Sequence, residues 1–344
     1  MYDITLFTPQ DMAKCSLVLR HLGRNTASME ASSQKIVNYI YQHFCDSQTG
    51  ENTCALVRLF KTHPYAELEE SLQQSARRLM NGNSPAADMK CWTLLAAAGT
   101  EPQWNSRHTA AENTAIPLVN TKLVAQMPAI SEIIRQFGLD IPTFVGIERE
   151  RLLQLESAVL NIFHVPQAKG SPFIPEQDSL IIPYQVKSVL GFGGLLRSGS
   201  LFAVVMFLKV KIPQRTAEMF KDLALSVKSA LSVSEEKSVF EPSENASSIF
   251  TNNNVTENQL LEYQVANLIQ LLDFSEQEML RQAARFQRTI DKLQREIADR
   301  KNQEEALTAS QEPFTGILNI PKDAIGRVEE NQGIQRFNQG EDQI

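Results

Sequence analysis

The sequence lacks the motifs that would assign it to the common enzyme classes. No GxSxG nucleophile elbow, HExxH helix or Walker phosphate loop occurs in it. The Gly-Gly-Asp/Glu-Glu-Phe loop of a diguanylate cyclase is also missing. None of the five histidines is followed by an acidic residue, as a phospho-accepting kinase histidine would be. We therefore expect no catalytic residues and no enzyme activity in this chain.

Metal and redox motifs are equally scarce. The four cysteines are scattered without a CxxC spacing, so neither a zinc site nor a disulfide framework is indicated. None of them is followed by histidine, as a bilin-attaching cysteine usually is. The expected state is four buried free thiols at Cys15, Cys45, Cys54 and Cys91. No metal site is predicted, and the sequence identifies no cofactor.

The chain also lacks basic clusters and long apolar runs. Its net charge is −7 with a pI near 5.4, and no block of Lys and Arg suits phosphate neutralisation, so nucleic acid is not an expected partner. The longest apolar run, Leu201–Leu208, is far shorter than the ~18 residues that cross a bilayer. The first residues carry Asp3 and Asp11 instead of a basic, apolar leader. We expect a cytoplasmic protein with no membrane insertion.

What the sequence does contain is a long heptad stripe at 265–307. Apolar residues recur at alternating steps of four and three without an interrupting Gly or Pro, a period that a second coiling helix buries best. This predicts a parallel homodimer through residues 265–307. The alternative is one amphipathic helix that folds back on its own domain. The dimerisation residues are expected to be Met279, Phe286, Ile290, Leu293, Ile297 and Leu307.

The first 234 residues combine strand-like and helix-like segments. Cys54–Phe60 and Leu180–Tyr184 are short apolar runs that predict strands. The runs Ser188–Leu196 and Leu201–Val210 flank a four-residue turn, which predicts an antiparallel hairpin. Cys91–Gly99 has strand length, although its alanines leave a helix open as an alternative.

Helices are expected between and after these strands. Two begin near Pro9 and Met29, and two more cover Thr121–Phe137, broken at Pro128, and Glu148–Leu160. A further helix follows Pro213, and its spacing is typical of a helix that lies on a sheet. Its apolar face comprises Phe220, Leu223, Ala224, Val227 and Leu231. The fold class is therefore α+β, an antiparallel sheet flanked by helices and followed by a long coiled-coil helix.

Composition divides the chain into four parts. After residue 234 the sequence turns to Ser, Glu and Asn without periodicity, which indicates a flexible linker over 235–256. The heptad helix follows over 257–311. The last part, 312–344, reads as one β-hairpin, and a lone hairpin is marginally stable in water.

Two stretches resemble known signalling domains. Ser188–Leu195, Leu201–Phe207 and the helix at Phe220–Leu225 resemble the closing strands and last helix of GAF-type sensory domains. Asp299–Ser310 and the segments within Ile317–Gly340 resemble the helix end and opening hairpin of PAS domains in bacterial sensor kinases and cyclases. Since the PAS-like part stops early, we expect the chain to be a fragment or a gene product that lost its output domain.

The GAF-like resemblance implies a small-ligand pocket over the sheet in residues 1–234. Two histidines lie at the ends of apolar segments beside Pro and aromatic residues, in Thr62–Tyr65 and Phe163–Pro166. Ordinary hydrogen-bonded loop histidines are the competing interpretation, and a haem or metal ligand is a third. The candidate ligand-binding residues are His63, Phe163, His164, Tyr184 and Phe192.

These features together predict a sensory or regulatory module of bacterial signal transduction, of the two-component or cyclic-nucleotide type. A ligand at the GAF-like domain would shift the packing of the paired coil, and a sensor kinase or response regulator is a further candidate partner. The alternative is a stand-alone interaction protein that forms mixed dimers with a full-length sensor kinase.

Overall fold

The computed structural model describes residues 1–23, 26–83, 85–110, 114–146, 160–235, 238–240 and 288–306, with Leu268, Ser275, Gln282 and Arg285 as single positions. The chain divides into two units, Met1–Leu268 and Ile269–Ile344. Several predicted features lie outside the described residues. They are residues 148–159 of the helix predicted over Glu148–Leu160, the linker residues 236–237 and 241–256, the coil residues Met279, Phe286 and Leu307, and the PAS-like segment 312–344.

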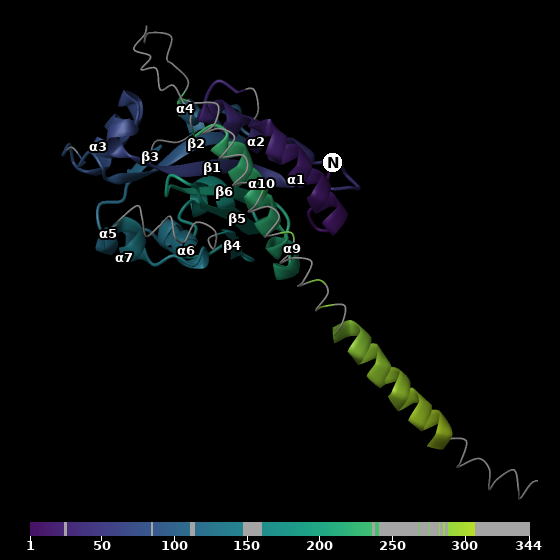
Figure 1. The fold of residues 1–344 in the computed structure, drawn as a ribbon. Helices are drawn as coiled ribbons and strands as arrows, with labels where there is room; N and C mark the ends of the chain where they lie inside the picture. Colours follow the sequence, from purple (N-terminus) through teal and green to yellow (C-terminus); the bar gives the residue numbers. More distant parts are fainter. Residues whose placement is uncertain are drawn as a thin grey trace, which may run out of the picture. The chain divides into compact units, whose positions relative to one another are not determined.

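The first unit is built on one six-stranded antiparallel sheet with the strand order β3-β2-β1-β6-β5-β4 (Figure 1). Every residue of β5 and β6 is buried, so both faces of the sheet are covered. The expected α+β class with an antiparallel sheet is confirmed. The strands are β1 Cys54–Pro64, β2 Lys90–Gly99, β3 Ala115–Pro117, β4 Leu160–Val165, β5 Ser188–Leu195 and β6 Leu201–Leu208.

The two apolar runs that were predicted to form a hairpin are paired strands. Strands β5 and β6 pair from Ser188–Leu208 to Leu195–Leu201, which confirms the antiparallel neighbours. The run Cys91–Gly99, for which a helix was the alternative, belongs to strand β2. Its small alanines pack on both faces of a covered sheet, so burial outweighs their low strand propensity.

The strand expected at Leu180–Tyr184 is wrong. Gln177–Ile181 forms a π-helical turn, η3, and Gln185 has a positive φ of 53°. The side-chain amide of Gln177 donates hydrogen bonds to the carbonyl oxygens of Ala168 at 3.0 Å and Ile174 at 2.8 Å. These bonds hold the segment in a turn that its apolar composition does not indicate.

Three helices cover one face of the sheet, as Figure 1 shows. They are α1 Pro9–Leu22, α2 Met29–His43 and α10 Phe220–Ser232, the last preceded by α9 Gln214–Glu218. Thr8 and Asp11 form a capping box at the start of α1, and Ser28 caps α2. The five apolar residues predicted to face the sheet from α10 are all fully buried, which confirms that face.

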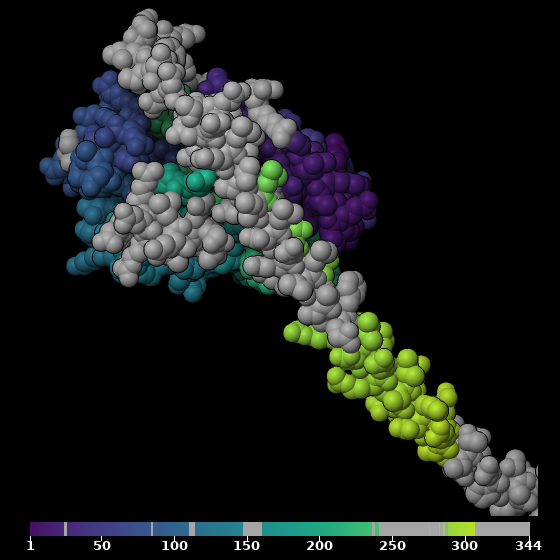
Figure 2. Space-filling view, in the orientation of Figure 1, coloured from purple at the N-terminus to yellow at the C-terminus, as the bar shows by residue number. Residues whose placement is uncertain are grey.

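The opposite face of the sheet is covered by short helices and turns. These are α5 Thr121–Ala125, α6 Pro128–Gln136 and α7 Ile141–Val145, together with η2 Pro102–Asn105 and η3. As expected, Pro128 begins a new helix and Gly138 follows its end, with a φ of 81°. In Figure 2 the N-terminal segment (purple) and the blue segments lie on opposite sides of this unit.

The β3 edge of the sheet carries a smaller cluster of buried residues. Here η1 Tyr65–Glu67 and α3 Glu70–Leu79 pack near β3, and α4 Arg107–Ala110 adjoins β2. Arg107, which is 2% exposed, pairs with Glu30 of α2 at 2.5 Å and with Glu69 at 2.8 Å. The ion pairs therefore join three separate segments at this edge.

In the second unit, residues 288–306 are helical, and all of them except Asp291 are exposed. Ile290, Leu293 and Ile297 lie along one stripe of this helix with exposed fractions of 46%, 51% and 66%. Large apolar residues this exposed form a surface that a second helix would bury. In the described part of the chain, no helix has the length and hydropathy needed to cross a membrane.

The close packing of β5 against β6 gives a first prediction. A Cβ atom on Gly193 would lie 2.1 Å from the Phe202 carbonyl oxygen and 3.0 Å from Cε2 of Phe137, so G193A forces backbone to move. We expect G193A to lower the free energy of unfolding by about 2 kcal/mol or more. Guanidinium denaturation of the full chain measures this.

G82A is the matched control, since it adds the same methyl group in open space. Gly82 has a φ of +85° and no heavy atom within 4 Å of the added Cβ, so its cost is backbone strain of about 1 kcal/mol. If G193A proves no more destabilising than G82A, the close approach of β5 and β6 is not a constraint on the fold.

Candidate functional site

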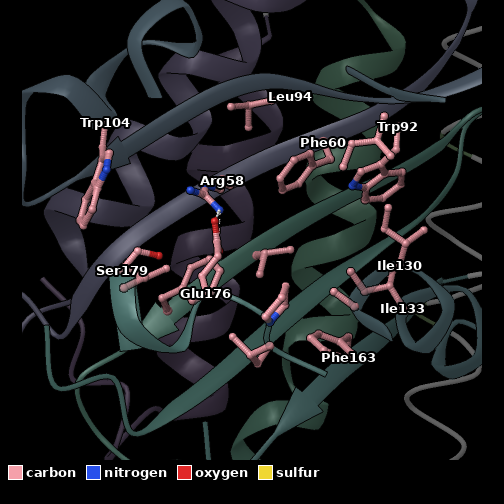
Figure 3. A pocket seen from close by; sticks show the side chains of 17 residues that line it. Arg58, Phe60, Trp92, Leu94, Trp104, Ile130, Ile133, Phe163, Glu176 and Ser179 are labelled. Carbon is pink, nitrogen blue, oxygen red and sulfur yellow. Dashed lines mark hydrogen bonds and ion pairs between the residues drawn. The ribbon is translucent and has the colours of Figure 1, made fainter. Parts of the chain in front are cut away.

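A cavity of about 620 Å³ lies between the sheet and the segments that cover the face opposite α10. Its volume is in the range of sites that hold small organic ligands. Figure 3 shows side chains from the sheet strands, and from the turn that carries Glu176 and Ser179, around this space. The wall is mainly apolar, and its aromatic members are Phe60, Trp92, Trp104, Phe163 and Phe207.

The register of the sheet explains why a hollow forms here. Arg58 of β1 pairs with Val205 of β6, Val205 pairs with Gly191 of β5, and Gly191 pairs with Phe163 of β4. Directly opposed residues in an antiparallel sheet project from the same face. Because Val205 is small and Gly191 has no side chain, the centre of this row is left open. Phe163 lies against Gly191, where a Cβ would approach it within 3.2 Å.

One ion pair lies inside the otherwise apolar wall. Nη1 of Arg58 donates to both carboxylate oxygens of Glu176, each at 2.9 Å, and the dashed line in Figure 3 marks the contact. The Arg58 side chain is 11% exposed and the Glu176 side chain 36%. The Arg58 guanidinium also lies 5.7 Å from the centre of the Phe207 ring. Nε of Arg58 is buried and has no hydrogen-bond partner among the described residues.

Flat aromatic surfaces border this ion pair. Phe60 and Trp92 stack with 5.4 Å between ring centres and 15° between planes. Trp104, from η2, contacts Tyr184 with 4.6 Å between ring centres. The chain has two tryptophans, and both line the cavity. Tryptophan emission therefore reports directly on this site.

The five residues predicted for ligand binding do not converge on one cavity. Phe163 lines the large cavity, and Tyr184 lies beside its wall through the contact with Trp104. Phe192 faces the other side of the sheet, where its ring lies 5.5 Å from that of Phe220 in α10. Successive strand residues alternate between faces, so Phe192 and its neighbour Gly191 contribute to different cores.

His164 lines a separate, smaller pocket of about 340 Å³ at the β4 edge. Its Nδ1 lies 2.9 Å from Oε1 of Gln214, and its backbone N–H donates to Oε1 of Gln136 at 3.0 Å. The side chain of Gln136 thus covers a backbone group on the free edge of the sheet. Most of the residues that line this pocket are polar, and none of them also lines the large cavity.

His63 is fully buried on the helix-covered side of β1, close to Lys61. Burial and the Lys61 ammonium lower the pKa of His63 well below its ordinary value. Burial also lowers the pKa of Lys61 to about 8, against the opposing effect of Glu235 and Glu67. His63 is therefore a neutral residue of the protein core, and it lines neither of the two pockets described above.

The segment that follows α10 packs against this buried region. Ser238 and Val239 accept hydrogen bonds from the backbone N–H groups of Met29 at 3.0 Å and Glu30 at 2.9 Å. These N–H groups belong to the first turn of α2, where backbone N–H groups have no hydrogen-bond acceptor within the helix itself. The Phe240 ring lies 5.6 Å from the His63 ring and 5.0 Å from the Arg107 guanidinium. The first residues of the expected linker range that the structure describes are therefore docked on the domain.

The described residues offer no group of three or more His, Cys, Asp or Glu side chains that could hold a metal ion. All four cysteines are buried and free, as the sequence predicted. Burial raises the pKa of the Cys15, Cys54 and Cys91 thiols to about 12, so their reactive thiolate forms are suppressed at neutral pH.

Three side chains with charged or hydroxyl groups line the cavity. They are Arg58, Glu176 and Ser179, and the first two form an ion pair. Comparison of the chain with protein-family models, with curated proteins and with solved structures finds no match.

The buried Lys61 gives a pH-dependent prediction. The pKa of Lys61 is about 8 in the folded chain, and the ordinary value for lysine is 10.5, so the unfolded state binds more protons between these two pH values. Stability from this residue therefore rises with pH across that window, and the cost of a buried ammonium is fully present below it. K61M should be more stable than the wild type at pH 7 by about 1–3 kcal/mol.

Chemical denaturation at pH values from 7 to above 10 checks this result. The advantage of K61M should shrink as the pH rises from about 8 toward 10.5. K187M, at an exposed lysine, is the control and should follow the wild type throughout. A constant difference between K61M and the wild type at all pH values would contradict the lowered pKa.

Proposed function

We propose that the chain is a sensory module of bacterial signal transduction. A small ligand binds in the cavity of the first unit, and binding alters the packing of a dimeric coil formed by residues 265–307. The proposal rests above all on the 620 Å³ apolar cavity with one ion pair in its wall. The resemblance of residues 188–225 to GAF-type sensory domains supports the same function.

The strands that form the cavity floor also contact the elements that lead out of the domain. β5 and β6 carry Gly191 and Val205 on the cavity face, and α10 packs on their opposite face. In the turn between them, Ser198 Oγ donates to Glu235 Oε1 at 2.6 Å, just after the end of α10. Nearby, the hydroxyl groups of Ser32 in α2 and Ser234 lie 2.6 Å apart. A ligand that shifts the hairpin therefore acts on groups at the end of α10.

The second support is the exposed stripe of Ile290, Leu293 and Ile297. On a lone helix these side chains remain in water, and pairing with a second copy removes their apolar area at about 25 cal/mol per Å². Arg300 and Glu304 continue the same stripe toward the C-terminus. The paired helix is thereby weaker at that end, where two registers can differ by a few kcal/mol.

The dimeric coil can be tested by cross-linking and by mass. The full chain should have the solution mass of a dimer, and a chain that ends at Thr256 the mass of a monomer. I297C should form a disulfide between copies on oxidation because seam positions of a parallel coil face each other. The native thiols are buried and do not interfere.

R295C provides the matched control, since position 295 lies on the opposite side of the helix from Leu293 and Ile297. It should cross-link at least about tenfold more slowly than I297C. A monomeric full chain, or equal cross-linking at both positions, would remove the coil from the proposal.

The docked segment after α10 can be tested separately. F240A removes a ring that packs between His63 and Arg107, so the hydrogen bonds from Met29 and Glu30 should open more often. We expect hydrogen exchange at these two amides to accelerate about tenfold or more, with β5 and β6 unchanged.

F173A is the control, because Phe173 is partly buried against the cavity-side core. This change should leave exchange at Met29 and Glu30 as it is in the wild type. Equal protection of both amides in F240A would show that Phe240 does not hold the segment in place.

A further inference from the structure

The Arg58 side chain is more enclosed than the Glu176 side chain. Arg58 belongs to β1, which pairs with β2 on one side and β6 on the other, and its side chain is 11% exposed. Glu176 lies outside any strand, and its side chain is 36% exposed. A rotation of the Glu176 side chain exposes its carboxylate to water at little cost, whereas Arg58 has no comparable route out of the wall.

The contact between the two also leaves hydrogen-bonding capacity on the guanidinium. Glu176 is bound end-on, through Nη1 alone, at 2.9 Å. An arginine holds a carboxylate best through two parallel N–H donors. Nε of Arg58 is buried and has no partner in the described part of the chain, so the guanidinium has one donor that a turn of the side chain would bring to a side-on carboxylate.

The rest of the wall selects a flat, apolar body. Phe60 and Trp92 present parallel rings, and Trp104 and Phe163 border the same space. Such surfaces favour stacking with an aromatic ring. Arg58 is the one basic side chain that lines the cavity among the described residues, so nucleotides and other polyphosphates would lack the cations they need.

We propose that the ligand is an aromatic monocarboxylate whose carboxylate pairs with Arg58 and releases Glu176 toward solvent. This inference rests on the proposed ligand-binding function of the cavity. An ammonium ligand would place a second cation beside Arg58. A neutral aromatic ligand would give Arg58 no negative charge in place of the Glu176 carboxylate.

Three probes of one shape test the ligand class by isothermal titration calorimetry on the full chain. They are biphenyl-4-carboxylate, biphenyl-4-carboxamide and the cationic biphenyl-4-ylmethylamine. We expect the carboxylate to bind about tenfold or more tightly than the carboxamide and the amine to bind weakest. Tryptophan emission should change on binding because Trp92 and Trp104 line the cavity.

Two variants assign the recognition to the ion pair. R58M should remove the preference for the carboxylate and leave carboxamide binding within about twofold, whereas R135M at an exposed arginine should change nothing. E176Q keeps Arg58 in place and removes its competitor, so it should bind the carboxylate about threefold or more tightly. E176Q gives a result even if R58M fails to fold.

Three results would overturn the inference. These are equal or tighter binding of the carboxamide or amine, a carboxylate preference that survives in R58M, and no binding of any probe to the wild type. Equal binding of all three probes would refute the carboxylate and leave the cavity as a ligand site. The coil is judged without any probe, by solution mass and cross-linking, so failure of the proposed signalling function is recognised independently.

Discussion

The antiparallel register that sets Arg58, Val205, Gly191 and Phe163 in one row determines most of what this domain can do. Strands buried on both faces contribute to two cores at once. Successive side chains point to opposite faces, so the position of a residue along the strand decides which core it joins. On the α10 face this requirement is met by large residues such as Phe192, which contacts Phe220. On the other face, the same strand offers glycine, and the space above it becomes a cavity. The cavity is thus a consequence of sheet register, which the helix layer behind it keeps fixed.

The side chains of Arg107, Lys61 and Arg58 show how differently an enclosed charge can be accommodated in one fold. Arg107 is held by two carboxylates and lies under Phe240, so its charge is fully compensated and its position is structural. Lys61 has its nearest acceptor in the Thr62 carbonyl oxygen at 3.4 Å, and burial lowers its pKa accordingly. Arg58 stands between these cases, with a partner that is one-third exposed. A buried charge whose partner can leave at low cost is the arrangement that suits exchange with a ligand.

The sequence predicted the elements whose periodicity is local, and it missed those set by distant contacts. The β5–β6 hairpin and the buried face of α10 follow from patterns that a single element displays. The turn at η3 depends on hydrogen bonds from the Gln177 amide to the carbonyl oxygens of Ala168 and Ile174 in the preceding loop, and the apolar run that overlaps the end of η3 favoured a strand instead. Arg58 was missed as a site residue because a lone arginine in a strand reads as solvent-facing. The sequence did contain a signal. The residues on both sides of Arg58 along the strand, Leu56, Val57, Leu59 and Phe60, are all apolar. Both faces of the strand are therefore apolar, and neither is expected to face solvent.

His63 and Phe192 were chosen because histidine beside proline and aromatic residues over a sheet suit a pocket, but strand parity sends both to the helix-covered core. That placement bears on how the domain ends. The segment Ser238–Phe240 uses the unpaired N–H groups of α2 and seats Phe240 against His63 and Arg107, so the exit from the domain is attached to its core by ordinary packing. A ligand influences a distant helix only through differential contacts with two states of such an element. In this chain such a segment is short and partly exposed, and it follows Glu235, whose carboxylate accepts a hydrogen bond from Ser198 in the turn between β5 and β6.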